Sequence, residues 1–219
     1  MRKSVLTLMA GLVMLAVTAP LLKAEEPKAE AAGIAIVDAT KCNGGFETGE
    51  VDPWAPVFVQ VSTMSSGETY PNNIIKVVKD PAFASKDKNC LSLQAAGDPK
   101  GALICARLDL RDIQGIDLEK GRTFILSWDI RNGEKPFQTP IAEFLALTKD
   151  GAVVAKGETI AEAPAVADKW VTRRVKFTMP DTLKEFKSIH LRIGYAIQPT
   201  EAAASYLGFI DNISLVQTK

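Results

Sequence analysis

The residues of this sequence that could do chemistry are 26 carboxylates, 26 lysines and arginines, one histidine and three cysteines. They do not form the motifs of common enzymes: Gly-x-Ser-x-Gly, His-Glu-x-x-His and a glycine-rich phosphate loop are all missing from the sequence. Two carboxylates could hydrolyse a glycoside, but nothing in the sequence singles out a pair. We therefore expect a binding protein rather than an enzyme.

Two segments, 124–131 and 189–198, alternate between apolar and polar residues, which predicts half-buried strands. Their outward polar positions include Asp129, Arg131, His190, Arg192 and Gln198. If the two strands are neighbours, these side chains form one polar surface that can bind a ligand and contributes little to stability. The alternative is a solvated sheet face that binds nothing.

The three cysteines are Cys42, Cys90 and Cys105. Cys90 and Cys105 flank a strong turn signal, Gly-Asp-Pro-Lys-Gly at 97–101. Opposed residues of an antiparallel hairpin can form a disulfide, so we expect these two to pair and Cys42 to stay free. No Cys-x-x-Cys or Cys/His spacing indicates a zinc site.

Short apolar or alternating segments recur along the chain, separated by turn dipeptides such as Asn132-Gly133 and Asp150-Gly151. The expected strands are 56–62, 74–78, 91–94, 103–108, 124–131, 144–148, 171–178, 189–198 and 209–216. Many short strands with little helix predict an all-β sandwich or barrel.

Several of these segments, in their order along the chain, resemble landmarks of the CenC-type carbohydrate-binding modules. The landmarks are Asn-Gly-Gly-Phe-Glu-Thr-Gly at 43–49 with Trp54, Leu-Ser-Leu at 91–93, the strand 124–131, the strand that follows Trp170, and Phe-Ile-Asp-Asn-Ile-Ser-Leu at 209–215. The resemblance implies a galactose-binding-like jelly roll, a β-sandwich of two antiparallel sheets. It also implies that a glycan or polysaccharide binds on the polar sheet surface.

In that family the opening glutamate and the closing aspartate often share a structural calcium ion. The matching residues here are Glu47 and Asp211. Carboxylate oxygens suit calcium, and backbone carbonyls usually complete its shell. The alternative is that both carboxylates accept hydrogen bonds from nearby backbone N–H groups.

The three tryptophans, Trp54, Trp128 and Trp170, are more readily explained by packing than by sugar stacking. Trp128 shares its parity with Phe124 and other apolar residues of its strand, which is the expected core face. Buried aromatic side chains contribute strongly to core stability.

The N-terminus predicts export. Arg2 and Lys3 precede an apolar run from Ser4 to Ala19, and Leu22-Lys23-Ala24 then offers a small residue at the cleavage position. Residues 1–24 therefore read as a cleavable signal peptide. Residues 25–35 are expected to be a flexible tether and 36–219 the jelly-roll domain. The apolar run is too short to span a bilayer, so no membrane span is expected after cleavage.

Cleavage removes three basic residues, which leaves 23 basic against 26 acidic residues and a net charge of −3. This charge disfavours nucleic acid as a partner. We expect a non-catalytic, glycan-binding module that is secreted, periplasmic or on the cell surface. The alternative function is a structural or protein-interaction sandwich that has a protein partner and no sugar affinity.

Overall fold

Two antiparallel sheets form the structure, which is a computed structural model of the chain. The model describes residues 33–60, 74–96, 102–119, 121–133, 139–148, 151–161, 168–179, 188–196 and 205–218. Among these residues no helix has the length and apolar character needed to cross a membrane.

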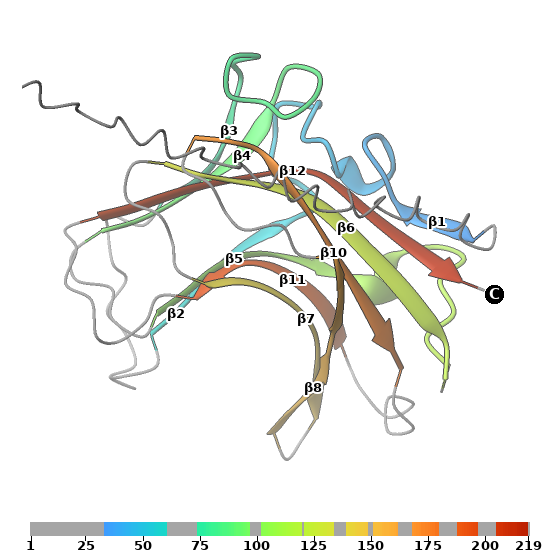
Figure 1. Ribbon diagram of the computed structural model, residues 1–219. Coiled ribbons are helices and arrows are strands. Elements are labelled where there is room, and N and C mark those ends of the chain that lie inside the picture. The colour runs from blue at the N-terminus through green and yellow to red at the C-terminus, as the bar shows by residue number, and fades with distance from the viewer. Residues whose placement is uncertain are drawn as a thin grey trace, which may run out of the picture. The chain divides into compact units, whose positions relative to one another are not determined.

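The larger sheet has seven strands in the order β3-β4-β12-β6-β10-β9, with β1 also paired to β12. Its strands are β1 (Ile34–Val37), β3 (Ile74–Val78), β4 (Cys90–Ala96), β6 (Thr123–Asn132), β9 (Glu158–Ala161), β10 (Val171–Thr178) and β12 (Ser205–Thr218). Figure 1 shows this sheet stacked on the second one.

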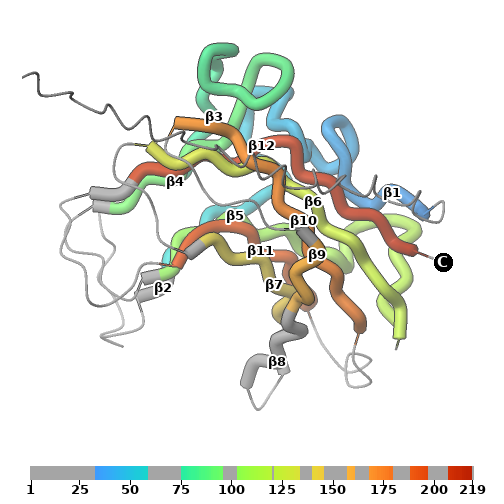
Figure 2. The backbone as a smooth tube through the Cα atoms, viewed as in Figure 1, coloured from blue at the N-terminus to red at the C-terminus, as the bar shows by residue number. Residues whose placement is uncertain are grey.

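The smaller sheet has five strands in the order β2-β5-β11-β7-β8. They are β2 (Ala55–Gln60), β5 (Ala102–Asp109), β7 (Thr139–Thr148), β8 (Gly151–Lys156) and β11 (Ser188–Ala196). Two short 3-10 helices, η1 (Lys41–Asn43) and η2 (Leu110–Asp112), precede β2 and follow β5. In Figures 1 and 2 the five-stranded sheet is curved, and its concave side faces away from the seven-stranded sheet.

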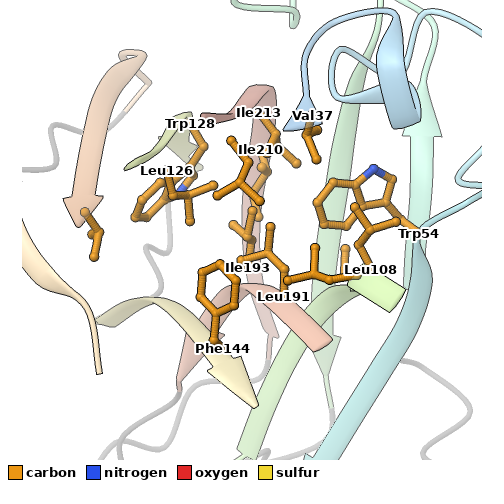
Figure 3. Close-up of a cluster of buried hydrophobic side chains, with 14 of the residues drawn as sticks. Val37, Trp54, Leu108, Leu126, Trp128, Phe144, Leu191, Ile193, Ile210 and Ile213 are labelled. Atoms are coloured by element: carbon orange, nitrogen blue, oxygen red, sulfur yellow. The ribbon is translucent and has the colours of Figure 1, made fainter. Parts of the chain in front are cut away.

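The core lies between the sheets because alternate residues of each strand point inward. On β6 these residues include Leu126 and Trp128, and on β11 they include Leu191 and Ile193. Figure 3 shows these four side chains within the buried cluster, to which both sheets contribute. The predicted inward parity of both strands is therefore confirmed, and so is the all-β sandwich.

Each predicted strand appears, although 61–62 and 197–198 lie outside the described residues. Some strands are longer than expected, and β7 and β8 form a tight hairpin in which Thr148 pairs with Gly151. No sequence pattern predicted β9 or β1. Because β1 begins at Ile34, the sheet includes the last two residues of the range 25–35 that we expected to be a tether. Expectations for 1–24 and for the turn at 97–101 lie outside the described residues.

The predicted disulfide is wrong. Cys90 lies in the seven-stranded sheet and Cys105 in the five-stranded sheet, so the chain between them crosses from one sheet to the other instead of forming a hairpin. All three cysteines are free, and Cys90 and Cys105 are fully buried. Burial raises the pKa of both buried thiols to about 12, so they stay protonated and unreactive.

The opening segment packs directly against the closing strand. The N–H of Ile213 donates a hydrogen bond to the carbonyl of Gly44 at 2.9 Å. A Cβ at Gly44 would lie 2.3 Å from the carbonyl oxygen of Ile213, so the contact requires glycine. The opening motif therefore has a structural role at this junction.

Candidate functional site

The five polar positions expected on one surface do not share one. Asp129 and Arg131 belong to β6 in the seven-stranded sheet, whereas His190 and Arg192 belong to β11 in the five-stranded sheet. The two strands are therefore not neighbours, and each sheet turns its polar face outward on its own side of the sandwich. Gln198 lies outside the described residues.

On the seven-stranded side, Asp129 is buried, with 5% of its surface exposed. Its carboxylate accepts hydrogen bonds from the Ser85 hydroxyl at 2.7 Å, the Thr172 hydroxyl and the Asn212 amide at 3.2 Å. Ser85 belongs to the loop 79–89, which connects β3 to β4. Asp129 thus fastens this loop to the sheet and is not available to a ligand.

Arg131 holds the same loop. Its guanidinium lies 5.2 Å from the ring centre of Phe83 and 5.9 Å from that of Phe209. It also donates to the carbonyl of Ala82 at 3.4 Å and lies 3.7 Å from the carboxylate of Asp168. A guanidinium stacked on aromatic rings and held by a carbonyl stabilises the loop. Both polar positions of β6 therefore have structural partners.

The five-stranded sheet carries a second set of charged residues, which we call the polar sheet face. It comprises Arg107 and Asp109 of β5, Glu143 of β7, and His190 and Arg192 of β11. The register places Arg192 between Arg107 and Glu143, and His190 beside Asp109. Leu108 and Leu191, which alternate with these residues along β5 and β11, belong to the core, so the polar residues face the other side of the sheet. That side of the sheet is concave (Figure 2).

Two arginines, Arg107 and Arg192, are neighbours on the polar sheet face. Arg192 Nη1 lies 3.2 Å from Glu143 Oε1, which gives one arginine a carboxylate partner. Arg107 pairs with Arg192 across the strands, and like charges in such a pair are destabilising. The buried Nε of Arg192 has no hydrogen-bond partner among the described residues. Arg107, Glu143 and Arg192 are each only partly buried, so a ligand can reach them on this face.

His190 lies on the polar sheet face but is largely covered, with 6% of its surface exposed. Burial lowers the pKa of His190 below its usual 6.5, and the nearby charge of Arg107 lowers it further. The imidazole is therefore neutral at pH 7, with one donor and one acceptor nitrogen. Its Nε2 lies 3.6 Å from Asp109 Oδ2, and its Nδ1 has no partner among the described residues.

Arg107, Asp109 and Glu143 are residues that the sequence reasoning missed. The signal was present for two of them: Arg107 and Asp109 alternate with the apolar Ala106 and Leu108 on β5. Glu143 had no such signal, because its strand begins five residues before the range 144–148 that was expected. Together with His190 and Arg192 they offer donors and acceptors at the spacing of a sheet.

The carboxylates of Glu47 and Asp211 both accept hydrogen bonds from the backbone of the loop 79–89. Glu47 Oε1 accepts hydrogen bonds from the backbone N–H groups of Lys88 and Asn89, at 3.1 and 2.9 Å. Asp211 Oδ2 accepts from those of Ser85 and Lys86, at 2.8 and 3.4 Å. These contacts match the alternative in which both carboxylates accept hydrogen bonds from nearby backbone N–H groups.

Calcium binding at Glu47 and Asp211 stays a prediction that a melting curve can test. A cation that binds only the native state raises the melting temperature by mass action. Melting temperatures measured in calcium and in a chelator therefore differ if the site exists, and Asp211→Ala removes the difference. Equal melting temperatures for the unaltered protein would remove the site.

Two of the three tryptophans have the packing role that we expected. Trp54 and Trp128 each expose 2% of their surface and belong to the buried cluster. Trp54 also donates a hydrogen bond from Nε1 to the carbonyl of Cys42 at 2.9 Å. Trp170 lies partly buried just before β10.

No protein-family model and no curated protein matches the sequence. Solved structures do resemble it. The CBM22-1 xylan-binding domain from Paenibacillus barcinonensis Xyn10C is 14% identical with a TM-score of 0.58, covering 87% of this chain and 99% of that one. The CBM22-2 domain of the same protein is 12% identical with a TM-score of 0.57, covering 80% and 98%.

An enzyme also resembles this chain. The Stig cyclase Fisc from Fischerella sp. TAU is 15% identical with a TM-score of 0.54, covering 85% of this chain and 98% of that one. At these identities the likeness shows the fold alone, which is a jelly-roll β-sandwich. The two modules named above are CBM22 domains, and the comparisons do not confirm the CenC-type resemblance.

Proposed function

We propose that this protein is a non-catalytic carbohydrate-binding module, similar to the CenC-type modules, that holds a glycan on the polar sheet face. The observation that carries the proposal is the set of five outward polar residues on the concave side of the five-stranded sheet. The fold that the chain shares with xylan-binding domains supports it.

The chemistry of this face suits a ligand rich in hydroxyl groups. A sugar hydroxyl both donates and accepts, so it can bridge a carboxylate such as Glu143 and a guanidinium such as Arg107. The polar residues are spread over three adjacent strands, β5, β11 and β7. A surface of this width favours an extended chain of sugars over a small ion.

We also propose that the protein is exported, because residues 1–24 have the charged start, apolar middle and small-residue end of a signal peptide. Mass spectrometry of the exported protein should then find Glu25 as its first residue. Recovery of an intact Met1 form from the membrane fraction would contradict cleavage.

Affinity electrophoresis tests the binding function directly. The protein is run in native gels that contain xylan, β-glucan, galactan or pullulan, and in a gel without polysaccharide. We expect retardation by at least one of them, xylan first, because two structural neighbours are named as xylan-binding domains. Serum albumin in the same gels controls for the viscosity of the polysaccharide.

Migration that no polysaccharide changes, followed by a glycan array without a signal, would overturn the glycan-binding proposal. The alternative of a protein-interaction sandwich would then replace it.

A further inference from the structure

A pocket of about 270 Å³ lies at the edge of the sandwich, where β5 ends and η2 begins. We call it the edge pocket. Its lining comes from the opening segment and from the β5–η2 junction: Lys41, Cys42, Pro53, Leu108, Asp109, Asp112, Ile113 and Gln114. Asp109 belongs both to this pocket and to the polar sheet face, so the two surfaces are continuous.

Hydrogen bonds fix the two walls of the edge pocket. On one wall, Trp54 Nε1 holds the carbonyl of Cys42 at 2.9 Å, and Lys41 Nζ donates to the carbonyl of Ala35 at 2.9 Å. On the other wall, Asp109 Oδ1 accepts the N–H of Arg111 at 3.1 Å and caps η2. The pocket is therefore preformed, which lowers the entropic cost of binding.

The lining combines apolar and polar groups in the way that a pyranose requires. Leu108, Ile113 and Pro53 offer apolar surface for the C–H groups of a sugar ring. Asp109 and Asp112 offer carboxylate oxygens, which accept hydrogen bonds from hydroxyl groups. Since Lys41 is the one cation among these residues, the pocket has a net negative charge and disfavours acidic sugars.

We propose that the edge pocket binds one neutral sugar residue, the terminal unit of the glycan that lies on the polar sheet face. This inference rests on the proposed function and deepens it. The volume of the pocket suits a single sugar ring, and we assign that ring to the end of the glycan. The protein then recognises chain ends as well as the body of a polysaccharide.

Cys42 provides a probe for the occupancy of the edge pocket. Cys42 is half-buried and lines the pocket, whereas Cys90 and Cys105 are fully buried. Alkylation of the native protein by iodoacetamide therefore reports on Cys42, and Cys42→Ser gives the background rate. The experiment measures the alkylation rate with increasing xylose, glucose and galactose, and with glucuronate as the acidic probe.

At a concentration of ten times the Kd, a neutral sugar in the pocket should slow alkylation about tenfold, because the free fraction falls in proportion. Glucuronate should slow the alkylation of Cys42 less than the neutral sugars do. Asp112→Ala removes a hydrogen-bond acceptor from the lining and should weaken protection by about tenfold or more. Glu158→Ala, which removes an exposed carboxylate from β9 of the other sheet, should leave protection unchanged.

An alkylation rate that none of the three neutral sugars lowers would overturn the edge pocket as a sugar site. If affinity electrophoresis still shows retardation, the glycan-binding proposal survives and the pocket proposal alone fails. Equal protection in the unaltered protein and in Asp112→Ala would show that the lining does not hold the sugar, and would also overturn the inference.

Discussion

Asp129→Ala should lower the free energy of unfolding by about 3 kcal/mol or more, because a hydrogen bond to a buried charge contributes about 1.5–3 kcal/mol. The carboxylate accepts bonds from Ser85, Thr172 and Asn212, and the substitution leaves all three donors without it. This effect is the opposite of what we expected from an outward polar residue of an alternating strand. Urea denaturation followed by circular dichroism measures it.

Ser127→Ala is the matched control, since Ser127 lies two residues earlier on the same strand and is only half-buried. It should change the free energy of unfolding by less than about 0.5 kcal/mol, as surface substitutions usually do. If Asp129→Ala lowers the free energy of unfolding no more than this control does, the hydrogen bonds of Asp129 do not hold the loop 79–89 on the sheet.

Trp128→Ala should lower the free energy of unfolding by about 3–5 kcal/mol, which is the range for removing a large aromatic side chain from a core. Trp128 exposes 2% of its surface and packs in the cluster between the sheets (Figure 3). A loss of this size is a large part of the stability of a single domain, so we expect partial unfolding at room temperature. The change in urea midpoint and the near-ultraviolet circular dichroism report it.

Trp128→Phe separates packing from polar function at the same position. The indole Nε1 of Trp128 is buried without a hydrogen-bond partner among the described residues, so its loss removes no hydrogen bond seen there. We expect Trp128→Phe to lower the free energy of unfolding by less than half as much as Trp128→Ala does, because a ring still fills most of the space. An equal loss of unfolding free energy in Trp128→Phe and Trp128→Ala would contradict a role of Trp128 in packing.

The alternation of β6 and β11 predicted which residues face the core, because a strand turns successive side chains to opposite faces. Alternation does not tell which strands become neighbours. Asp129 and Arg192 have the same outward parity in their strands but lie on opposite sides of the sandwich. That arrangement depends on contacts between segments far apart in the sequence, and no local pattern encodes it.

The same limit explains the cysteine error. A turn signal between Cys90 and Cys105 indicates that the chain reverses, but a reversal can join two strands of one sheet or cross between sheets. In this protein it crosses. Glu47 and Asp211 show a further limit. The backbone N–H groups that donate to them come from the loop 79–89, and no local pattern indicates where this loop lies.

The most direct test of glycan binding on the polar sheet face compares two variants that each lose one positive charge. Arg107→Ala alters this face, whereas Lys176→Ala alters an exposed position of β10 in the seven-stranded sheet. Isothermal titration with the oligosaccharide of whichever polysaccharide retards the protein measures both affinities. We expect about a tenfold to hundredfold weaker Kd for Arg107→Ala and an unchanged Kd for Lys176→Ala. An unchanged Kd for a folded Arg107→Ala variant, or an equal loss in both variants, would contradict the account.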